Sequence, residues 1–358
     1  MDIQFNFGIK NGNFAGNFAG NIRGAITTII GPSGSGKTTF LKCFSGDLKP
    51  TYGYIKIGSN ILFSSDKKIE IPQHKRNISM VYQNDLLFPH MSVKKNILYG
   101  YKYNKESSKL DILRICKILK IDKLMNKKPS ELSGGESQRV ALARSICSNP
   151  YILLLDEPFN SLDVVTKAPI LFYLKELQKI LHLQILFVTH SYQEMFFLSG
   201  NSILIDEGEI KLIGDPHEVI SKKIKNLPTN EINNYLSGVV IEKIQKEDNS
   251  GVVSIGEIKL VVPINDCSLG SKVIVQFFAS DVIISTEELT NVSARNIIKG
   301  EVLFLEEMEN SYLLTILISL DIKIYVEITR YSMEKLCINK GSTIFALLKS
   351  SSCRVLGY

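Results

Sequence analysis

The residues with the clearest capacity for chemistry lie near the N-terminus. Residues 31–38 read Gly-Pro-Ser-Gly-Ser-Gly-Lys-Thr. Glycines at this spacing let successive backbone N–H groups converge on phosphate oxygens, and the N-terminus of a following helix adds a favourable field. In such a loop the Lys37 ammonium reaches the β- and γ-phosphates of a nucleotide, and the Thr38 hydroxyl ligates Mg²⁺. The predicted nucleotide-binding residues are Gly31, Pro32, Ser33, Gly34, Ser35, Gly36, Lys37, Thr38 and Thr39.

A second segment, residues 151–158, places two carboxylates at the end of an apolar run. It reads Tyr-Ile-Leu-Leu-Leu-Asp-Glu-Pro, so Asp156 and Glu157 directly follow a predicted buried strand. The carboxyl ends of strands in an open α/β sheet present ligand-binding groups. Asp156 would hold Mg²⁺ through water, and Glu157 would orient and deprotonate an attacking water. Each segment alone could be a turn or a strand end without chemistry, but together they indicate nucleotide hydrolysis.

The hydrophobic pattern predicts the elements that must position these groups. Residues 25–30 predict a buried strand before the glycine-rich loop, and residues 39–44 predict the start of a helix after it. Up to about residue 226, strand-like runs alternate with helical runs, which is typical of an α/β domain with a largely parallel sheet. Beyond residue 233, short runs of period 2 predict an all-β region, either a small barrel or a sandwich.

Shifts in composition divide the chain into three predicted domains, residues 1–228, 229–290 and 291–357. The first boundary falls in a polar stretch that contains Pro228, and the second falls near a break between β-like runs. The only internal repeat is the tetrapeptide Asn-Phe-Ala-Gly, which occurs twice within residues 13–20. A repeat this short predicts part of a strand and not a repeat architecture.

Composition excludes several classes of protein. The 358 residues are 44% hydrophobic and 22% charged, which is ordinary for a globular protein. No apolar run approaches the roughly 18 residues of a spanning helix, and the N-terminus lacks a signal-peptide layout, so we expect a cytoplasmic chain without its own membrane span. Six cysteines without a C-x-x-C pair predict a reducing compartment and buried, inert thiols. The net charge of +6 comes from scattered lysines, so nucleic acid is not an expected partner.

Residues 132–139, Leu-Ser-Gly-Gly-Glu-Ser-Gln-Arg, give the chain a family resemblance. With the two segments above, residues 1–225 resemble the ATP-binding subunits of ABC transporters, whose signature motif is LSGGQ-like. Further family landmarks follow in the family's order: Gln83 matches the Q-loop, Asp163 matches the D-loop and His190 matches the switch histidine. Members usually stack adenine on an aromatic residue before the phosphate loop. The sequence leaves three candidates open for that role, Phe7, Phe14 and Phe18.

This resemblance implies an ABC-type P-loop NTPase domain with a helical subdomain at about residues 84–147. It also implies a homodimer that holds two ATP molecules between its chains. The implied ligands of Mg²⁺ are Thr38, Gln83 and Asp156. The implied contacts to the nucleotide of the partner protomer are Ser133, Gly134, Gly135 and Glu136. The implied catalytic residues are Glu157, His190 and Lys37.

The end of the chain carries a second resemblance. Residues 293–300 begin Ser-Ala-Arg-Asn and end in Gly, and residues 346–351 read Ala-Leu-Leu-Lys-Ser-Ser. Both segments are similar to the molybdate-binding Mop module, so OB-like, Mop-type all-β modules are expected here. A tetrahedral dianion suits hydroxyls, backbone N–H groups and a cation. The implied oxyanion residues are Ser293, Arg295, Asn296, Lys349 and Ser350. The alternative is a packing module whose oxyanion site has been lost.

The whole chain therefore resembles the ATP-binding proteins of molybdate importers, the ModC family. The resemblance implies a peripheral ATPase at the cytoplasmic face of the cell (inner) membrane. Its implied partners are two integral membrane permease subunits, an extracytoplasmic molybdate-binding protein that acts through the permease, and molybdate at the C-terminal module. Two alternatives remain open. One is an importer ATPase for sulfate, polyamine, iron or sugar, and the other is a soluble ATPase regulator that senses molybdate.

Overall fold

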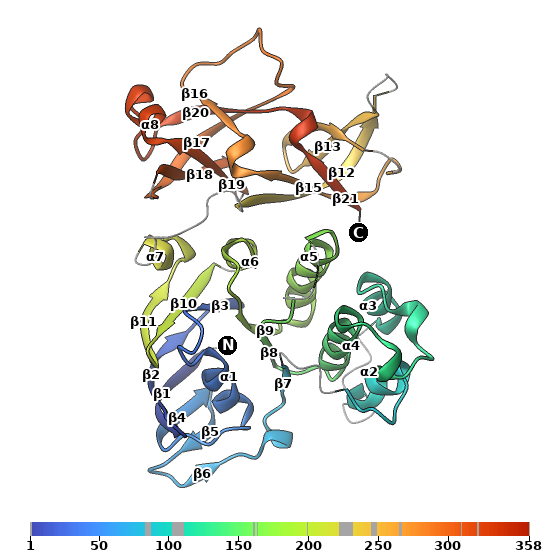
Figure 1. Cartoon of the computed structure of the whole chain (residues 1–358), viewed down its shortest axis with the longest axis vertical. Helices are drawn as coiled ribbons and strands as arrows, with labels where there is room; N and C mark the ends of the chain where they lie inside the picture. Colours follow the sequence, from blue (N-terminus) through green and yellow to red (C-terminus); the bar gives the residue numbers. More distant parts are fainter. Residues whose placement is uncertain are drawn as a thin grey trace. The chain divides into compact units, whose positions relative to one another are not determined.

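A computed structural model describes residues 2–82, 87–101, 111–159, 162, 164–198, 200–221, 232–244, 249–264, 267–308, 310–320 and 322–357. The chain forms two compact units, Met1–Val219 and Ile220–Tyr358 (Figure 1). The predicted boundary between residues 228 and 229 lies outside the described residues. Within the described ranges, no helix combines the length and hydropathy of a membrane span.

The first unit is built on an eleven-stranded sheet with the order β6-β5-β4-β1-β2-β11-β10-β3-β9-β8-β7. Its strands are β1 (Ile3–Asn11), β2 (Phe14–Ile22), β3 (Ile26–Ile30), β4 (Tyr52–Ile57), β5 (Asn60–Ser64), β6 (Ile69–Glu70), β7 (Ile78–Val81), β8 (Ile152–Asp156), β9 (Gln184–Val188), β10 (Asn201–Asp206) and β11 (Glu209–Gly214). Neighbours from β10 to β7 pair in parallel, whereas β1 pairs with β2 and β4 in antiparallel fashion. The expected α/β fold with a parallel centre is confirmed.

The central strands are buried on both faces, which explains their mostly apolar sequences. β3, β8 and β9 are buried at every position. Successive side chains of a strand point to opposite faces. Accordingly, Leu153 and Leu155 join one hydrophobic core, while Ile152 and Leu154 join another. This burial fixes the carboxyl ends of the three strands, where the chemistry is expected.

Helices follow the parallel strands and carry the predicted motifs. They are α1 (Lys37–Ser45), α2 (Val93–Tyr101), α3 (Ile112–Ile118), α4 (Gly134–Cys147), α5 (Val164–Leu181), α6 (Tyr192–Leu198) and α7 (Pro216–Ser221). α1 follows β3, α5 follows β8 and α6 follows β9. Figure 1 shows α2, α3 and α4 grouped beyond β7, and all three fall within the predicted helical subdomain of about residues 84–147.

The second unit contains two five-stranded antiparallel sheets, with the orders β14-β13-β12-β15-β21 and β16-β20-β17-β18-β19. The elements are β12 (Asn233–Lys243), β13 (Ser250–Ile255), β14 (Ile258–Pro263), β15 (Lys272–Phe278), β16 (Ile283–Ser285), β17 (Asn296–Glu307), β18 (Ser311–Ser319), β19 (Ile322–Thr329), α8 (Arg330–Leu336), β20 (Thr343–Leu348) and β21 (Arg354–Gly357). The all-β modules expected at this end are confirmed.

The two C-terminal sheets exchange strands. β16 precedes residue 291 but pairs with β20, and β21 ends the chain but pairs with β15. Residues from both sheets also share one hydrophobic core. The predicted boundary between residues 290 and 291 therefore does not separate the two sheets, because each sheet takes an edge strand from the other side of it.

The prediction that the tetrapeptide pair is the only internal repeat was wrong, because the same two sheets are related by a much longer repeat. β12 to β15 have the same neighbour order as β17 to β20. Each half begins with Asn-x-x-x-Gly, at Asn234 and Gly238 and again at Asn296 and Gly300. A Cβ at Gly238 would lie 2.5 Å from Val253 Cγ1, and a Cβ at Gly300 would lie equally close to a side chain of β18. Glycine at both places permits the close approach of the next strand.

Each repeated asparagine satisfies the backbone of the other sheet's edge strand. Asn296 Oδ1 accepts the Val261 N–H at 2.7 Å, and Asn296 Nδ2 donates to the Val261 carbonyl at 3.0 Å. Asn234 makes the same pair of bonds to Tyr325, at 2.6 and 2.9 Å. Val261 lies on β14 and Tyr325 on β19, which end their sheets. These bonds occupy backbone groups that an edge strand otherwise leaves unpaired.

All six cysteines are free. Cys43, Cys116, Cys147 and Cys353 are buried, and burial raises the pKa of the Cys43 thiol to about 12. These four match the expected inert thiols. The expectation was wrong for Cys337, which is exposed at the end of α8.

Candidate active site

The glycine-rich loop joins β3 to α1 and holds its lysine inward. Lys37 is 5% exposed, and its Nζ donates to the Gly31 carbonyl at 3.0 Å and to the Pro32 carbonyl at 2.7 Å. A Cβ at Gly31 would lie 2.0 Å from the Ile205 carbonyl, so only glycine fits there. The Ser35 hydroxyl is buried without a hydrogen-bond partner in the described part of the chain. A loop with an inward cation and an unsatisfied hydroxyl is suited to bind phosphate.

Two side chains with oxygen atoms that could ligate a metal ion lie beside this loop. The Thr38 hydroxyl donates to Asp156 Oδ1 at 3.1 Å, which joins the start of α1 to the end of β8. Asp156 is 2% exposed, and burial raises the pKa of its carboxyl. Mg²⁺ prefers hard oxygen ligands and keeps several of its waters, so a hydroxyl and a carboxylate on one side suit it. The predicted ligands Thr38 and Asp156 are therefore close together.

The predicted base and the switch histidine are in direct polar contact. β8 and β9 are parallel neighbours with Asp156 opposite Val188, so Glu157 and His190 follow adjacent strand ends. His190 Nε2 lies 2.7 Å from Glu157 Oε1. Glu157 has a φ of 50°, which costs about 1 kcal/mol for a residue with a Cβ. Its N–H donates to the Val188 carbonyl at 3.1 Å, which holds the sharp turn that directs the carboxylate.

The signature residues form a helix cap. The Ser133 hydroxyl accepts the Glu136 N–H at 3.3 Å, and Glu136 Oε2 accepts the Ser133 N–H at 2.8 Å. This reciprocal pair is a capping box at the N-terminus of α4. The bond from the Ser133 backbone lowers the pKa of the Glu136 carboxyl. Sequence reasoning missed this role, although the pattern Ser-x-x-Glu before an apolar helix was the signal that could have found it.

The structure places the two segments that carry the predicted oxyanion residues side by side, because Asn296 on β17 lies opposite Leu348 on β20. Ser293 and Lys349 are exposed, and Arg295 Nη1 donates to the Ser250 hydroxyl at 3.2 Å. Asn296 is 2% exposed, and its amide oxygen and amide nitrogen both bond the Val261 backbone. Ser350 begins a short 3₁₀ helix, Ser350–Ser352. The oxyanion role of these residues stays a prediction.

Known proteins match this chain along nearly its whole length. The family described as ABC transporter matches residues 21–160, and the TOBE domain matches residues 292–355. The molybdenum import ATP-binding protein ModC of Mesorhizobium japonicum is 33% identical, over 98% of this chain and 96% of that protein. This chain belongs to the ModC family. The ModC protein of Pasteurella multocida is 32% identical, over 91% of this chain and 92% of its own length.

A solved structure extends the match to the three-dimensional fold. It is the dimeric, post-hydrolysis state of an ATP-binding cassette bound to ADP and Pi, at 27% identity and a TM-score of 0.51. The match covers 60% of this chain and 98% of that cassette. The first unit of this ModC-family chain is therefore an ABC-type P-loop NTPase.

Two ABC landmarks of this ModC-family chain cannot be placed. Gln83, the predicted Q-loop ligand of Mg²⁺, and Asp163, the predicted D-loop residue, lie outside the described residues. Their roles stay predictions.

The aromatic candidates for adenine differ in their surroundings. Phe7 and Phe18 are each 1% exposed and pack in the core with Phe40. Phe14 is partly buried, and its ring carbon Cζ lies 2.5 Å from the place that a Cβ on Gly36 would take. Its ring therefore borders the phosphate loop, which favours Phe14 over the two core residues.

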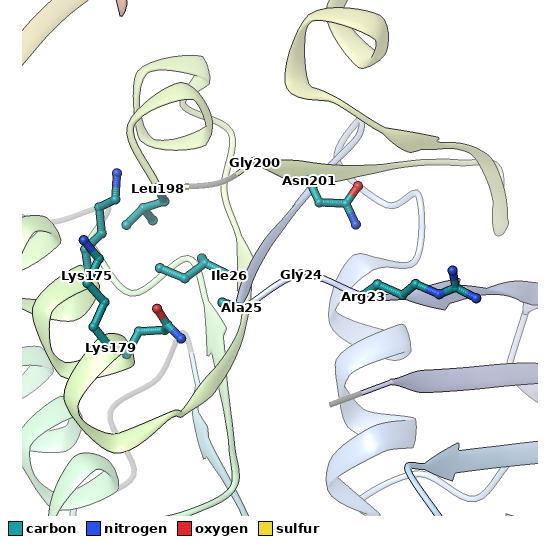
Figure 2. Close-up of a pocket in the computed structure, with 10 residues that line it drawn as sticks. Arg23, Gly24, Ala25, Ile26, Lys175, Lys179, Leu198, Gly200 and Asn201 are labelled. Carbon is teal, nitrogen blue, oxygen red and sulfur yellow. The ribbon is translucent and has the colours of Figure 1, made fainter. Parts of the chain in front are cut away.

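A cavity of about 490 Å³ lies at the opposite end of β3 from the phosphate loop (Figure 2). Its lining includes Arg23, Lys175 and Lys179. Figure 2 shows Arg23 pointing away from the two lysines, and Lys175 Nζ donates to the Phe197 carbonyl at 2.7 Å. The three cations do not converge on one ligand, and this cavity is not the nucleotide site.

Proposed function

We propose that this ModC-family chain is the ATP-hydrolysing subunit of a molybdate importer and that it couples ATP hydrolysis to uptake. Its near full-length similarity to proteins named for molybdenum import carries the proposal. The site geometry supports ATP hydrolysis. Asp156, which bonds Thr38, and Glu157 lie at the end of β8, and His190 contacts Glu157 from the end of the adjacent β9.

Different residues of the chain bind the phosphates, accept the proton of water and position the base. The N–H groups of the loop and Lys37 bind the β- and γ-phosphates and hold the terminal phosphorus in place. Glu157 orients a water molecule and accepts its proton while the water oxygen bonds to the γ-phosphorus and the bond to ADP breaks. His190 holds the Glu157 carboxylate in position and contacts the γ-phosphate. Glu157 then returns the proton to solvent.

The Thr38 hydroxyl and the Asp156 carboxylate would hold Mg²⁺, with Gln83 as the third protein ligand. When bound, Mg²⁺ would neutralise the negative charge that develops on the phosphate groups. Asp156 ligates the ion only when ionised, although its burial favours the protonated form. We therefore expect ATP with Mg²⁺, not ATP alone, to hold this carboxyl ionised.

Two copies of the chain form the working unit, with Ser133, Gly134, Gly135 and Glu136 of one copy against the nucleotide of the other. The capping box fixes the Ser-Gly-Gly turn before this contact forms, so less entropy is lost on closure. Each copy docks on an integral membrane permease subunit at the cytoplasmic face of the inner membrane. An extracytoplasmic molybdate-binding protein delivers the substrate to the permease.

Co-purification and ATPase measurements test this proposal. We expect the chain to purify with an integral membrane permease and to hydrolyse ATP only with Mg²⁺. Glu157→Gln should bind ATP normally and hydrolyse it at a background rate. A chain that never associates with a permease would instead be a soluble regulator, and undiminished turnover in Glu157→Gln would overturn the assigned base.

A further inference from the structure

A buried network lies directly behind the switch histidine. Thr189 precedes His190 and is 2% exposed, and its hydroxyl donates to Glu194 Oε2 at 2.5 Å. The same hydroxyl accepts the Ser191 N–H at 2.9 Å. Both neighbours of His190 in the chain are thus held by one side chain, so the network restricts the path of the backbone that carries the imidazole.

A cation on another helix holds the carboxylate of this network. Glu194 Oε1 lies 2.8 Å from Lys167 Nζ, and the Glu194 side chain is 6% exposed. Glu194 lies on α6 and Lys167 on α5, the helix that starts one residue after Asp163. A buried carboxylate with a bonded hydroxyl and a close ammonium has few alternative positions, because breaking either contact leaves charge or polarity unsatisfied.

We propose that Glu194 is a positioning residue for ATP hydrolysis: through Thr189 it fixes the backbone on both sides of His190, and Lys167 orients its carboxylate. The inference rests on the proposed function of this site and assigns no contact between Glu194 and nucleotide. A change in the position of α5 reaches His190 through Lys167, Glu194 and Thr189. The network therefore connects the helix after the D-loop to the residue that holds Glu157.

Threonine 189 offers the most selective test, because valine has nearly the same shape and lacks only the hydroxyl. In Thr189→Val we expect kcat for ATP hydrolysis to fall about tenfold, with KM for ATP changed less than about twofold. Thr189→Ser keeps the hydroxyl and should retain near wild-type kcat. Thr28→Val is the matched control, because Thr28 is equally buried on neighbouring β3 and its hydroxyl bonds Ser202 at 2.7 Å, away from this network.

A double-mutant cycle separates positioning from a general structural role. If Thr189 acts through His190, single-turnover hydrolysis by His190→Ala should not fall further when Thr189→Val is added. An equal additional fall would overturn the proposal, as would an unchanged kcat in Thr189→Val or the same tenfold fall in Thr28→Val. Lys167→Met should reduce kcat in the same direction, and Lys167→Arg should restore it.

A second readout does not depend on activity. The imidazole signal of His190, assigned by its loss in His190→Ala, should shift in the NMR spectrum of ¹³C-histidine-labelled Thr189→Val and stay in place in Thr28→Val. An unshifted signal in Thr189→Val would overturn the inference alone. A wild-type chain without any ATPase activity in complex with its permease would overturn the proposed function, while the NMR comparison would still test the network.

Discussion

The nucleotide site and the oxyanion candidates were both predicted from short motifs, yet the structure arranges them differently. In the first unit the predicted side chains bond one another, as in the pairs Thr38–Asp156 and Glu157–His190. In the second unit Asn296 bonds a strand backbone and Arg295 bonds Ser250. A motif at the ends of parallel strands is brought together by the fold itself, whereas a motif in an antiparallel sheet can serve the packing of that sheet against its neighbour.

The largest expected effect tests whether the first of these regions is the catalytic one. Replacing Glu157 by Gln should lower kcat about a thousandfold, because the amide cannot accept the proton of water. ATP binding should be unchanged, since Lys37 and the loop remain. Steady-state hydrolysis with a parallel nucleotide-binding titration measures both. A loss of binding equal to the loss of rate would show that Glu157 supports the loop and is not the base.

Asp156→Asn should act in opposite directions on activity and stability. Hydrolysis should fall about a hundredfold because a neutral amide is a poor Mg²⁺ ligand. The free energy of unfolding without nucleotide should rise by about 1 kcal/mol at pH 7, because a buried carboxylate is replaced by a neutral group.

The sign of the pH dependence follows from the raised pKa of Asp156. The folded state binds this proton more tightly than the unfolded state, so the group favours folding below its unfolded pKa of about 3.8. That contribution is lost as the pH rises through the folded pKa. The advantage of Asp156→Asn should therefore be small near pH 4 and larger at pH 7. Chemical unfolding of Asp156→Asn and wild type at both pH values measures this difference in the free energy of unfolding. A difference that decreased as the pH rose would contradict this account.

Asn296→Ala tests whether Asn296, in the second unit, has a structural role. Loss of the amide leaves the Val261 N–H and carbonyl on an edge strand, which should cost about 2 kcal/mol of stability. Asn234→Ala is the matched control, because Asn234 makes the same two bonds to Tyr325. Chemical unfolding should give similar losses for both variants. A much smaller loss in Asn296→Ala, with loss of molybdate binding, would make Asn296 a ligand.

The smallest expected effect concerns the signature helix. Glu136→Ala removes one half of the capping box and should cost about 0.5–1 kcal/mol. Glu136→Gln keeps an acceptor for the Ser133 N–H and should be near neutral. Thermal unfolding of the two variants measures the difference. Equal destabilisation by Gln and Ala would show that the negative charge, and not the hydrogen bond, stabilises α4.

Much of the first unit could be predicted from the sequence because its signals are local. The run before Gly31 and the run before Asp156 are strands buried on both faces, and such strands are mostly apolar along their whole length. The contact Glu157–His190 then follows from the neighbouring parallel strands β8 and β9, and the bond Thr38–Asp156 joins the carboxyl ends of β3 and β8 on either side of β9. The capping box at Ser133 was equally local and could have been predicted with the same rules.

The second unit could not be predicted in the same way because its organisation depends on contacts between distant residues. The exchange of β16 and β21 joins residues on opposite sides of a predicted boundary, and no local pattern encodes it. In the sequence, the internal repeat is marked by two pairs with the same spacing, Asn234 with Gly238 and Asn296 with Gly300. The matching strand orders and the paired bonds to Val261 and Tyr325 make the equivalence visible.

Uptake of labelled molybdate into vesicles tests the central claim most directly. The vesicles would contain the permease with this chain on the ATP-accessible side, and the extracytoplasmic binding protein would be supplied on the other side. We predict accumulation of molybdate that needs ATP and Mg²⁺, is absent with Glu157→Gln and does not occur with sulfate. Accumulation of sulfate at the same rate, or molybdate uptake that continues unchanged with Glu157→Gln, would contradict the account.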